Sequence, residues 1–317
     1  MVDPVAEPAD YTFGGAPIPK LALEVEPSLA GLRLDQALAR LLPEESRSRL
    51  ARLVEEGAVL VDGERARPRL RLRGGERLEV ALLPRPEQSA FRPEDIALDV
   101  VHEDDDVLVV AKPAGLVVHP GSGNWAGTML NALLHRVPAL KGLPRAGIVH
   151  RLDKETSGLL VVAKNEAAMQ DLVRQLQART VKRTYLAIVR GAVPASGTVD
   201  APIGRHPTQR TRMAIVPGGK PAITHYRVRE RFGAHALVEC DLETGRTHQI
   251  RVHLASIGHP LEGDPVYGGR GERRLLRQAL HAWKLAFVHP RTRKTVQFTA
   301  PPPADFEALA ASLRGGG

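Results

Sequence analysis

Apolar residues recur at helical spacing in two short segments near the start of the chain. The segment "GLRLDQALARLL" repeats leucine every three or four positions from Leu34 to Leu42, as in a helix with one buried face. In the next segment, "EESRSRLARLVEEG", Ser46 suits the N-cap and Gly57 the position after the last turn. The apolar stripe of this second segment consists of Leu50, Leu53 and Val54. The pattern predicts two helices, each with one face on a core.

Short apolar runs and period-two alternation predict strands after these helices. A strand is expected at Val59–Val61, followed by a turn at Asp62-Gly63. In "ERARPRLRLRGGERLEV", arginine alternates with leucine or proline. Period two places alternate side chains on one face of an extended segment. We therefore expect a row of arginines on that face: Arg67, Arg69, Arg71 and Arg73.

From Ile96 onward the pattern alternates irregularly between strands and helices. "LDVVHEDDDVLVVAKPAG" predicts two strands around an acidic turn, and "GLLVVAKN" predicts another strand. Further strands are expected at Tyr185–Val189, Thr224–Val228, Ala236–Leu242, Leu280–Val288 and Thr295–Thr299. "EAAMQDLVRQLQAR" and "ADFEALAASL" read as helices. This order predicts an α+β fold, built around a mixed, largely antiparallel β-sheet with a central cleft.

Changes in composition divide the chain into four parts. Residues 1–20 are rich in Pro, Gly and Ala without periodicity and are expected to form a disordered tail. Residues 21–83 form a small α/β unit, and the proline-rich segment 84–95 is expected to be a linker. Residues 96–317 are expected to form one catalytic domain.

Composition narrows the functional classes. The 317 residues carry a formal net charge of +8, which favours a polyanionic partner such as nucleic acid; an arginine-rich proteome would be the alternative reason. Cys240 is the only cysteine, so neither an internal disulfide nor a cysteine-based zinc site can form. No signal peptide is expected, and the apolar runs are too short to cross a membrane. We expect a soluble cytoplasmic protein.

The outward face of the second helix adds to the basic segment. Because its apolar stripe faces the core, three arginines are expected to face outward together: Arg47, Arg49 and Arg52. With Arg69 and Arg71 they would bind phosphates, unless they form only a solvated surface. The motifs "RLDQAL", "SRSRLARLVEEG" and "AVLVDG" make this unit resemble the S4 RNA-binding domain.

Two polar motifs carry the candidate chemistry. "HRLDKETSG" places Asp153 in a loop before a strand, between Arg151 and Lys154; nearby cations keep a carboxylate ionised. An aspartate in such a loop is otherwise more often a cap or turn residue. "ETGRTHQIRVHLASIGHPLEGDPVYGG" places Arg246 at a strand–helix junction, where Thr247 is expected to cap the helix. We expect no metal site, because His248 and His253 are five positions apart rather than four.

These motifs, with "AKPAGLVVHPG", "RTYLAIVRG" and "LHAWKLAFVHP", make the chain from about Ile96 onward resemble the RluA family of pseudouridine synthases. The resemblance implies an enzyme that isomerises uridine in RNA without a metal or cofactor. It is strongest to those members with an S4-like domain that modify large-subunit (23S) ribosomal RNA. Ribosomal RNA, in some cases within an assembling subunit, is therefore the expected partner, and the protein is expected to be a monomer.

The resemblance also implies roles for individual residues. Asp153 would be the catalytic carboxylate that attacks the target uridine. Arg246 would form an ion pair with that carboxylate, and Tyr185 would pack on the base. The remaining candidates for contact with the substrate are Arg151, which would fill the gap left by the flipped nucleotide, Leu261, which would complete the pocket, and His119 and Lys112.

Two alternatives remain open on the sequence. A synthase of the same family could act on tRNA, since the motifs of the catalytic loop are shared. A ribosome-assembly or RNA-binding factor without catalysis would be expected to lack Asp153, Tyr185 or Arg246, and all three are present. Neither the target uridines nor their number follow from the motifs.

Overall fold

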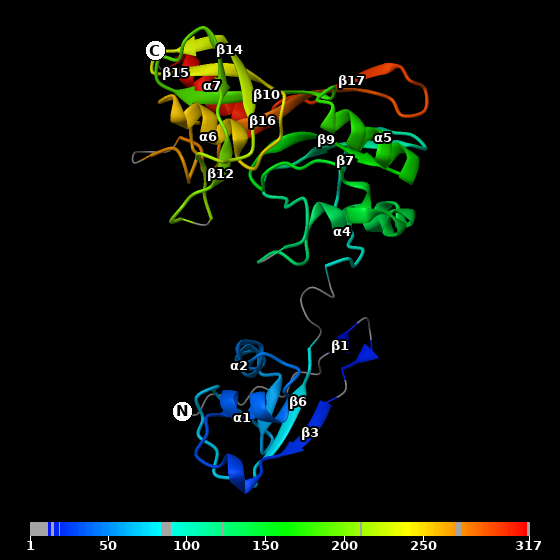
Figure 1. The fold of residues 1–317 in the computed structure, drawn as a ribbon, viewed down its shortest axis with the longest axis vertical. Helices are drawn as coiled ribbons and strands as arrows, with labels where there is room; N and C mark the ends of the chain where they lie inside the picture. The colour runs from blue at the N-terminus through cyan, green and yellow to red at the C-terminus, as the bar shows by residue number, and fades with distance from the viewer. Residues whose placement is uncertain are drawn as a thin grey trace. The chain divides into compact units, whose positions relative to one another are not determined.

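The computed structural model describes residues 12–13, 16–18, 20–83, 90–121, 123–209, 211–269 and 274–315. The chain forms two compact units, residues 1–88 and 89–317 (Figure 1). Each has a hydrophobic core of its own. The expected linker at 84–95 lies across the boundary between the units, and its residues 84–89 are outside the described part.

The first unit packs two helices against a small antiparallel sheet. Its sheet has the strand order β3-β6-β4-β5. The elements are β3 (Lys20–Glu24), η1 (Pro27–Leu29), α1 (Leu34–Leu41), α2 (Arg47–Glu55), β4 (Val59–Val61), β5 (Glu64–Arg65) and β6 (Arg77–Ala81). The Ser46 hydroxyl caps α2 by accepting a hydrogen bond from the amide of Arg49, and Gly57 takes the left-handed conformation just after the helix. Both helices and the strand at Val59–Val61 were predicted from the sequence and are confirmed.

Two expectations for this unit need correction. Most of the tail expected over 1–20 lies outside the described residues, but the described part holds a short antiparallel pair, β1 (Thr12–Phe13) and β2 (Ala16–Pro17). The arginine-rich segment after Arg65 is not a regular strand. The amide of Leu70 donates to the carbonyl of Arg67 in a turn, and only Arg71 makes a β-bridge, to Arg33.

The second unit surrounds one large sheet. Its strands are β7 (Asp99–Glu103), β8 (Val107–Lys112), β9 (Ser157–Ala163), β10 (Lys182–Arg190), β11 (Ser196–Asp200), β14 (Ile223–Phe232), β15 (His235–Leu242), β16 (Leu280–Val288) and β17 (Thr295–Thr299). A separate hairpin pairs β12 (Ile203–Arg205) with β13 (Met213–Ile215). The helices are α4 (Met129–Arg136), η2 (Pro138–Gly142), η3 (Pro144–Gly147), α5 (Glu166–Gln177), α6 (Gln249–Ser256) and α7 (Ala304–Gly315).

The large sheet is mixed and largely antiparallel, as the sequence predicted. Its order is β11-β14-β15-β10-β16-β9-β8-β7, with β17 paired to β16 (Figure 1). Only β16 and β9 run parallel, through His281–Ser157 and Ala282–Gly158. Gly158 is required there, because a Cβ at this position would lie 2.2 Å from the Ala282 carbonyl oxygen. This pairing joins the strand after the "HRLD" loop to the middle of the sheet.

Alternation along the strands divides the core between the two faces of the sheet. Leu108 and Val110 of β8 pack with α4 and α6 on one face, and Val107 and Val109 pack with α5 on the other. The second face also holds α7, which packs against Ile188 of β10. Among the described helices, none is long and apolar enough to span a lipid bilayer.

The second unit begins before Ile96. The side-chain amide of Asn131 in α4 donates to the carbonyls of Ala90 and Arg92, and the Glu94 carboxylate accepts a hydrogen bond from the amide of Gly127. The described part of the expected linker therefore packs on the catalytic unit. The proline content of the segment suggested a linker. Composition does not report hydrogen bonds to residues about 40 positions away, such as those from Asn131.

Candidate active site

Asp153 lies in a loop that is anchored at both ends. The preceding residue, Leu152, is buried in the core, and the loop leads directly into β9. Within the loop, the Thr156 amide donates to the carbonyl of Asp153 at 3.1 Å. The Asp153 side chain remains 17% exposed. The loop therefore presents one carboxylate at a fixed point on the surface of a rigid sheet.

The buried side chain of Lys112 holds this loop in place through hydrogen bonds. Its side chain is buried, and its ammonium donates to the carbonyls of Pro113, Leu116 and Lys154 at 2.7, 2.8 and 2.9 Å. Burial lowers the pKa of Lys112 to about 7, although the carboxylates of Glu155 and Asp153 oppose the shift. With all three N–H groups engaged, Lys112 is a positioning residue for the loop. Contact between Lys112 and the substrate stays a prediction.

Arg251 of α6 is the ion-pair partner of Asp153. Its Nη1 lies 3.0 Å from Asp153 Oδ2, while its Nε and Nη2 bind the two carboxylate oxygens of Asp264 at 2.8 and 3.0 Å. The guanidinium is only 4% exposed and Asp264 is fully buried. One cation thus serves two carboxylates, in the fork geometry that arginine favours. In the described part of the chain, no hydrogen bond engages Asp153 Oδ1.

The electrostatics of this triad favour an ionised Asp264 and a charged Arg251. Burial raises the pKa of Asp264, but hydrogen bonds and charge from Arg251 outweigh it, so the pKa lies below its usual value. Burial lowers the pKa of Arg251, but the two carboxylates raise it by more, so the pKa lies above its usual value. With both carboxylates ionised, the three side chains together carry one net negative charge.

Arg246, expected to form this ion pair, does not form it in the structure. Its Nε donates to the carbonyl of Pro221 at 3.1 Å, on the exposed side of the junction. The junction is longer than the sequence suggested: α6 starts at Gln249, and its N-cap is His248 rather than Thr247. Arg251 therefore falls in the first turn of the helix and reaches the site. Arg251, the arginine of "HQIR", was not among the residues predicted from the sequence, although its position near the start of the helix could have identified it.

Tyr185 of β10 lies in the same core cluster as Leu261 and beneath the site. Burial raises its pKa, while the charge of Arg183 lowers it and that of Asp153 raises it. Tyr185 shares its core cluster with Leu152, the residue that precedes Asp153. Arg183 is itself buried, and no hydrogen-bond partner for its Nε lies among the described residues. A Cβ on Gly245 would come within 2.5 Å of the Arg183 guanidinium, so glycine makes room for it.

Of the other residues predicted to contact the substrate, some lie at the surface and one lies in the core. Arg151 is exposed, beside the Asp153 loop. His119 is half-buried, and burial, followed by the charges of Arg145 and Arg151, lowers its pKa to about 4. Leu261 is fully buried and makes a β-bridge to Val189. It lies in the core cluster that also holds Leu152 and Tyr185, and its contact with the substrate stays a prediction.

The arginines of α2 are more engaged than expected. Arg47 pairs with Asp35 at 2.8 Å, and Arg52 pairs with Glu56 at 2.7 Å. Arg49 turns inward instead: it donates to the carbonyl of Leu83, and its side chain is only 19% exposed. The prediction that all three face outward together is therefore wrong for Arg49, because the end of the first unit packs beside it.

The arginines after β5 are more open. Arg69 and Arg71 are both exposed. Arg71 donates to the carbonyl of Gly31 at 2.8 Å. Among the described residues, no carboxylate pairs with its charge. The turn at residues 67–70 spreads these side chains over the surface instead of aligning them along a strand.

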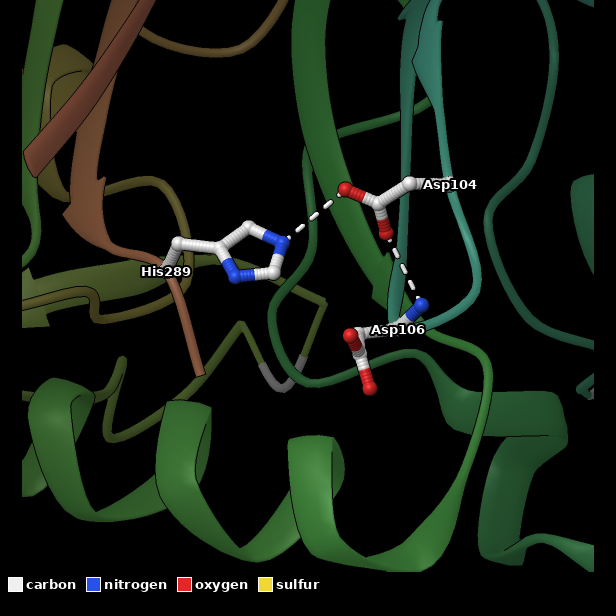
Figure 2. Close-up of side chains that lie close together, drawn as sticks. All are labelled: Asp104, Asp106 and His289. Carbon is white, nitrogen blue, oxygen red and sulfur yellow. Dashed lines mark hydrogen bonds and ion pairs between the residues drawn. The ribbon is translucent and has the colours of Figure 1, made fainter. Parts of the chain in front are cut away.

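One group of side chains away from this site has the composition of a metal site. Figure 2 shows Asp104 and Asp106 beside His289, with ligand atoms all within 4.8 Å of one another. Its chemistry is that of a closed hydrogen-bond network. The amides of Arg291 and Thr292 donate to His289 Nδ1, so Nε2 carries the proton that it donates to Asp104. Asp106 is paired with Arg291 at 2.6 Å. The group ties two hairpin turns together and presents no free ligand set.

Comparison with known proteins agrees with this architecture. Residues 106–256 match the sequence model of the family described as RNA pseudouridylate synthase, and residues 32–78 match that of the S4 domain. The human protein RNA pseudouridylate synthase domain containing 1 superposes with a TM-score of 0.55 at 30% identity, covering 70% of this chain and 96% of its own. The chain belongs to the RNA pseudouridine synthase family, a class of isomerases.

Within this class, two similar relatives carry the same name. "Ribosomal large subunit pseudouridine synthase D" of Nitrosomonas europaea is 55% identical over 302 residues, which cover 93% of this chain and 88% of the relative. The protein of that name from Xanthomonas campestris is 51% identical over 327 residues, covering 99% and 96%. The similarity therefore extends over both units of the chain.

Proposed function

We propose that this protein isomerises uridine to pseudouridine in large-subunit (23S) ribosomal RNA, with Asp153 as the catalytic carboxylate. The observation that carries the proposal is the arrangement of Asp153: Arg251 engages Oδ2 at 3.0 Å, and Oδ1 is left open at the surface. A carboxylate that is ionised, oriented and half free has the properties of a nucleophile. The names of the relatives supply the class of RNA.

In the proposed reaction, Asp153 acts on the target nucleotide at its ribose. The bond between C1′ and N1 breaks, the detached uracil rotates, and a new bond forms between C1′ and C5. The proton on C5 is lost, and the proton gained at N1 balances it, so no oxidant or reductant is required. Arg251, in place of Arg246, orients the Asp153 carboxylate through its hydrogen bond to Oδ2, and Tyr185 packs against the base.

The target base must leave the RNA stack before this chemistry begins. Extruding a nucleotide costs a few kcal/mol, which contacts with the protein must offset. Arg151 is the proposed group for this step, because it is exposed beside Asp153 and a planar guanidinium can stack in the vacated space. His119, whose low pKa keeps it uncharged at neutral pH, lies within the field of Arg151 and is proposed to contact the RNA.

The S4-like unit is proposed to bind the RNA backbone. Arg69 and Arg71 are the main phosphate contacts, and Arg47 and Arg52 contribute after exchange of their carboxylate partners. Modification of RNA within an assembling subunit, action as a monomer and a location in the cytoplasm stay predictions that accompany this proposal.

The proposal is tested by mapping pseudouridine across total RNA from cells with and without the gene. We expect specific 23S positions to lose pseudouridine on deletion and to regain it with the wild-type gene, but not with Asp153→Asn. Loss confined to tRNA would overturn the choice of substrate. Full restoration by Asp153→Asn would overturn the choice of catalytic residue.

A further inference from the structure

His248 has a backbone conformation that costs free energy. It precedes α6 with φ 57° and ψ 21°, in the left-handed region. For a residue with a Cβ this conformation costs about 1–2 kcal/mol, and glycine or asparagine adopts it more readily. Strained residues of this kind gather at functional sites. The imidazole of His248 lies between two groups of the site: its Nδ1 is 3.0 Å from Tyr267 Oη, and its Nε2 is 4.0 Å from Asp153 Oδ1.

The hydrogen bonds around Tyr267 determine which nitrogen of His248 carries the proton. The amide of Met213 donates to Tyr267 Oη at 2.9 Å. The tyrosine has one hydroxyl proton of its own, and His248 Nδ1 is the acceptor at hydrogen-bonding distance. Among the described residues the hydroxyl has no other acceptor, so we assign Tyr267 as the donor to Nδ1, which places the proton of the neutral ring on Nε2.

The environment of His248 favours the neutral ring. Burial lowers its pKa; the charges of Asp153 and Asp264 oppose this shift, and those of Arg251 and Arg151 reinforce it. The net effect is a pKa below the usual value. Tyr267 packs edge-on against the imidazole and lies under the guanidinium of Arg251, so the ring cannot rotate without disturbing the triad.

The Nε2–H group of His248 has no hydrogen-bond acceptor among the described residues. Asp153 Oδ1, at 4.0 Å, is beyond hydrogen-bonding distance. Both groups face the same small space: a partly buried donor with its orientation set, and the open oxygen of the carboxylate proposed to act at C1′. A substrate with C1′ near Oδ1 would also place a neighbouring atom within reach of Nε2–H.

We propose that His248 donates a hydrogen bond from Nε2–H to the O2 oxygen of the target uracil. This inference rests on the proposed function and adds a substrate-binding residue to it. When the bond between C1′ and N1 breaks, its electron pair remains on the uracil, and the charge is shared among N1, O2 and O4. O2 is attached to the carbon next to N1 and is therefore the carbonyl oxygen nearer to C1′. The donor keeps its proton throughout and stabilises the departing ring electrostatically.

Two substitutions separate this role from a structural one. His248→Asn suits the left-handed conformation, but its amide reaches only the position of Nδ1. His248→Gln places an amide N–H near the position of Nε2. In single-turnover reactions at saturating RNA, we expect Asn to slow turnover by about 10²–10³-fold, the usual loss for a removed donor of this kind. We expect Gln to slow turnover much less, by at most about tenfold. RNA affinity should stay within about threefold for both, since the phosphate contacts are unchanged. Equal losses for Asn and Gln would overturn the proposal.

A modified substrate identifies the acceptor atom. Sulfur accepts hydrogen bonds weakly, so 2-thiouridine at the target position should slow the wild-type enzyme more than it slows His248→Asn. With 4-thiouridine, the two proteins should show the same penalty. A 2-thio penalty equal in both proteins, or a His248-dependent penalty with 4-thiouridine, would overturn the assignment to O2. Failure of the proposed function would appear separately, as full activity of Asp153→Asn on unmodified RNA.

Discussion

The arginines singled out in the two units of this chain differ in burial and in their ion-pair partners. In the catalytic unit, Arg251 is buried and shared between Asp153 and Asp264. In the S4-like unit, Arg69 and Arg71 are exposed and have no carboxylate partner among the described residues, while the exposed Arg47 pairs with the buried carboxylate of Asp35. All of them add equally to the net charge of +8. In the proposed function, their surroundings decide whether that charge orients the catalytic carboxylate or attracts RNA.

The energetic consequences differ in the same way. Removing one partner of a buried ion pair costs about 3–5 kcal/mol, because the other charge is left uncompensated. An exposed pair contributes only about 0–1 kcal/mol, and salt screens it. Substitutions in the catalytic unit should therefore change turnover and stability, whereas substitutions in the S4-like unit should change affinity and its dependence on salt.

The largest effect is expected for Asp153→Asn. The change preserves size and removes the ionised oxygen, so turnover should fall by roughly 10⁴-fold or more, by analogy with other lost nucleophiles. RNA binding should change little. Release of tritium from RNA labelled at C5 of uridine measures the reaction directly. Substantial residual release from a preparation free of wild-type enzyme would contradict the role of Asp153.

Arg251→Lys should have the next largest effect, and Arg246→Lys is its matched control. Lysine keeps the charge but cannot reach both carboxylates with a planar fork. We expect turnover to fall by about 10²-fold or more, the size of effect seen when a preorganised electrostatic contact is lost. Arg246→Lys should stay within about threefold, since its side chain binds only a carbonyl at the surface. Similar losses in the two variants would remove the distinction between these arginines.

Asp264→Asn should change stability in a pH-dependent way. The pKa of Asp264 is lower in the folded protein than in the unfolded chain, mainly because Arg251 outweighs the effect of burial. Its stabilisation is therefore complete above the unfolded pKa of about 3.9 and is lost as pH falls through the folded pKa. At pH 7 the variant should be less stable by about 3 kcal/mol. Urea unfolding from pH 7 to pH 3 should show this difference shrinking; a constant difference would argue against ionised Asp264.

The smallest effect on turnover is expected in the S4-like unit. Each phosphate contact contributes about 0.7–0.9 to the slope of log K against log salt. Arg69→Gln with Arg71→Gln should therefore reduce the magnitude of that slope by about 1–2. The matched double change of Arg47 and Arg49 to Gln should reduce it by less, because both are already engaged within the protein. An equal reduction would mean that the helix arginines change partners freely when RNA binds.

Much of the local structure could be predicted because it depends on neighbours in sequence. The strands at Leu280–Val288 and Thr295–Thr299 occur at the predicted bounds, since period-two alternation reports directly on burial. Helix α2 begins after Ser46 for an equally local reason, the hydrogen bond that its hydroxyl accepts from the amide of Arg49. The largely antiparallel sheet followed from the order of these elements.

The site could be predicted only in part. The "HRLD" loop was identified, but the partner of Asp153 lies 98 residues away, and its identity depends on where a helix begins. The sequence placed the N-cap at Thr247, one residue before the observed His248, and assigned the ion pair to Arg246 at the junction instead of Arg251 in the first turn of α6. The inward turn of Arg49 depends on packing against the carbonyl of Leu83, 34 residues away. Composition and periodicity do not report such contacts.

The contrast between the two units is tested most directly by single-turnover rates at saturating RNA, measured side by side for Arg251→Lys and for the double change of Arg69 and Arg71 to Gln. We predict that the Arg251 variant keeps its RNA affinity within about threefold and loses at least about 10²-fold in rate. The double variant should bind more weakly, with a shallower salt slope, and reach the wild-type rate once the RNA is saturating. A normal saturating rate in Arg251→Lys, or a collapsed one in the double variant, would contradict the division of roles between the units.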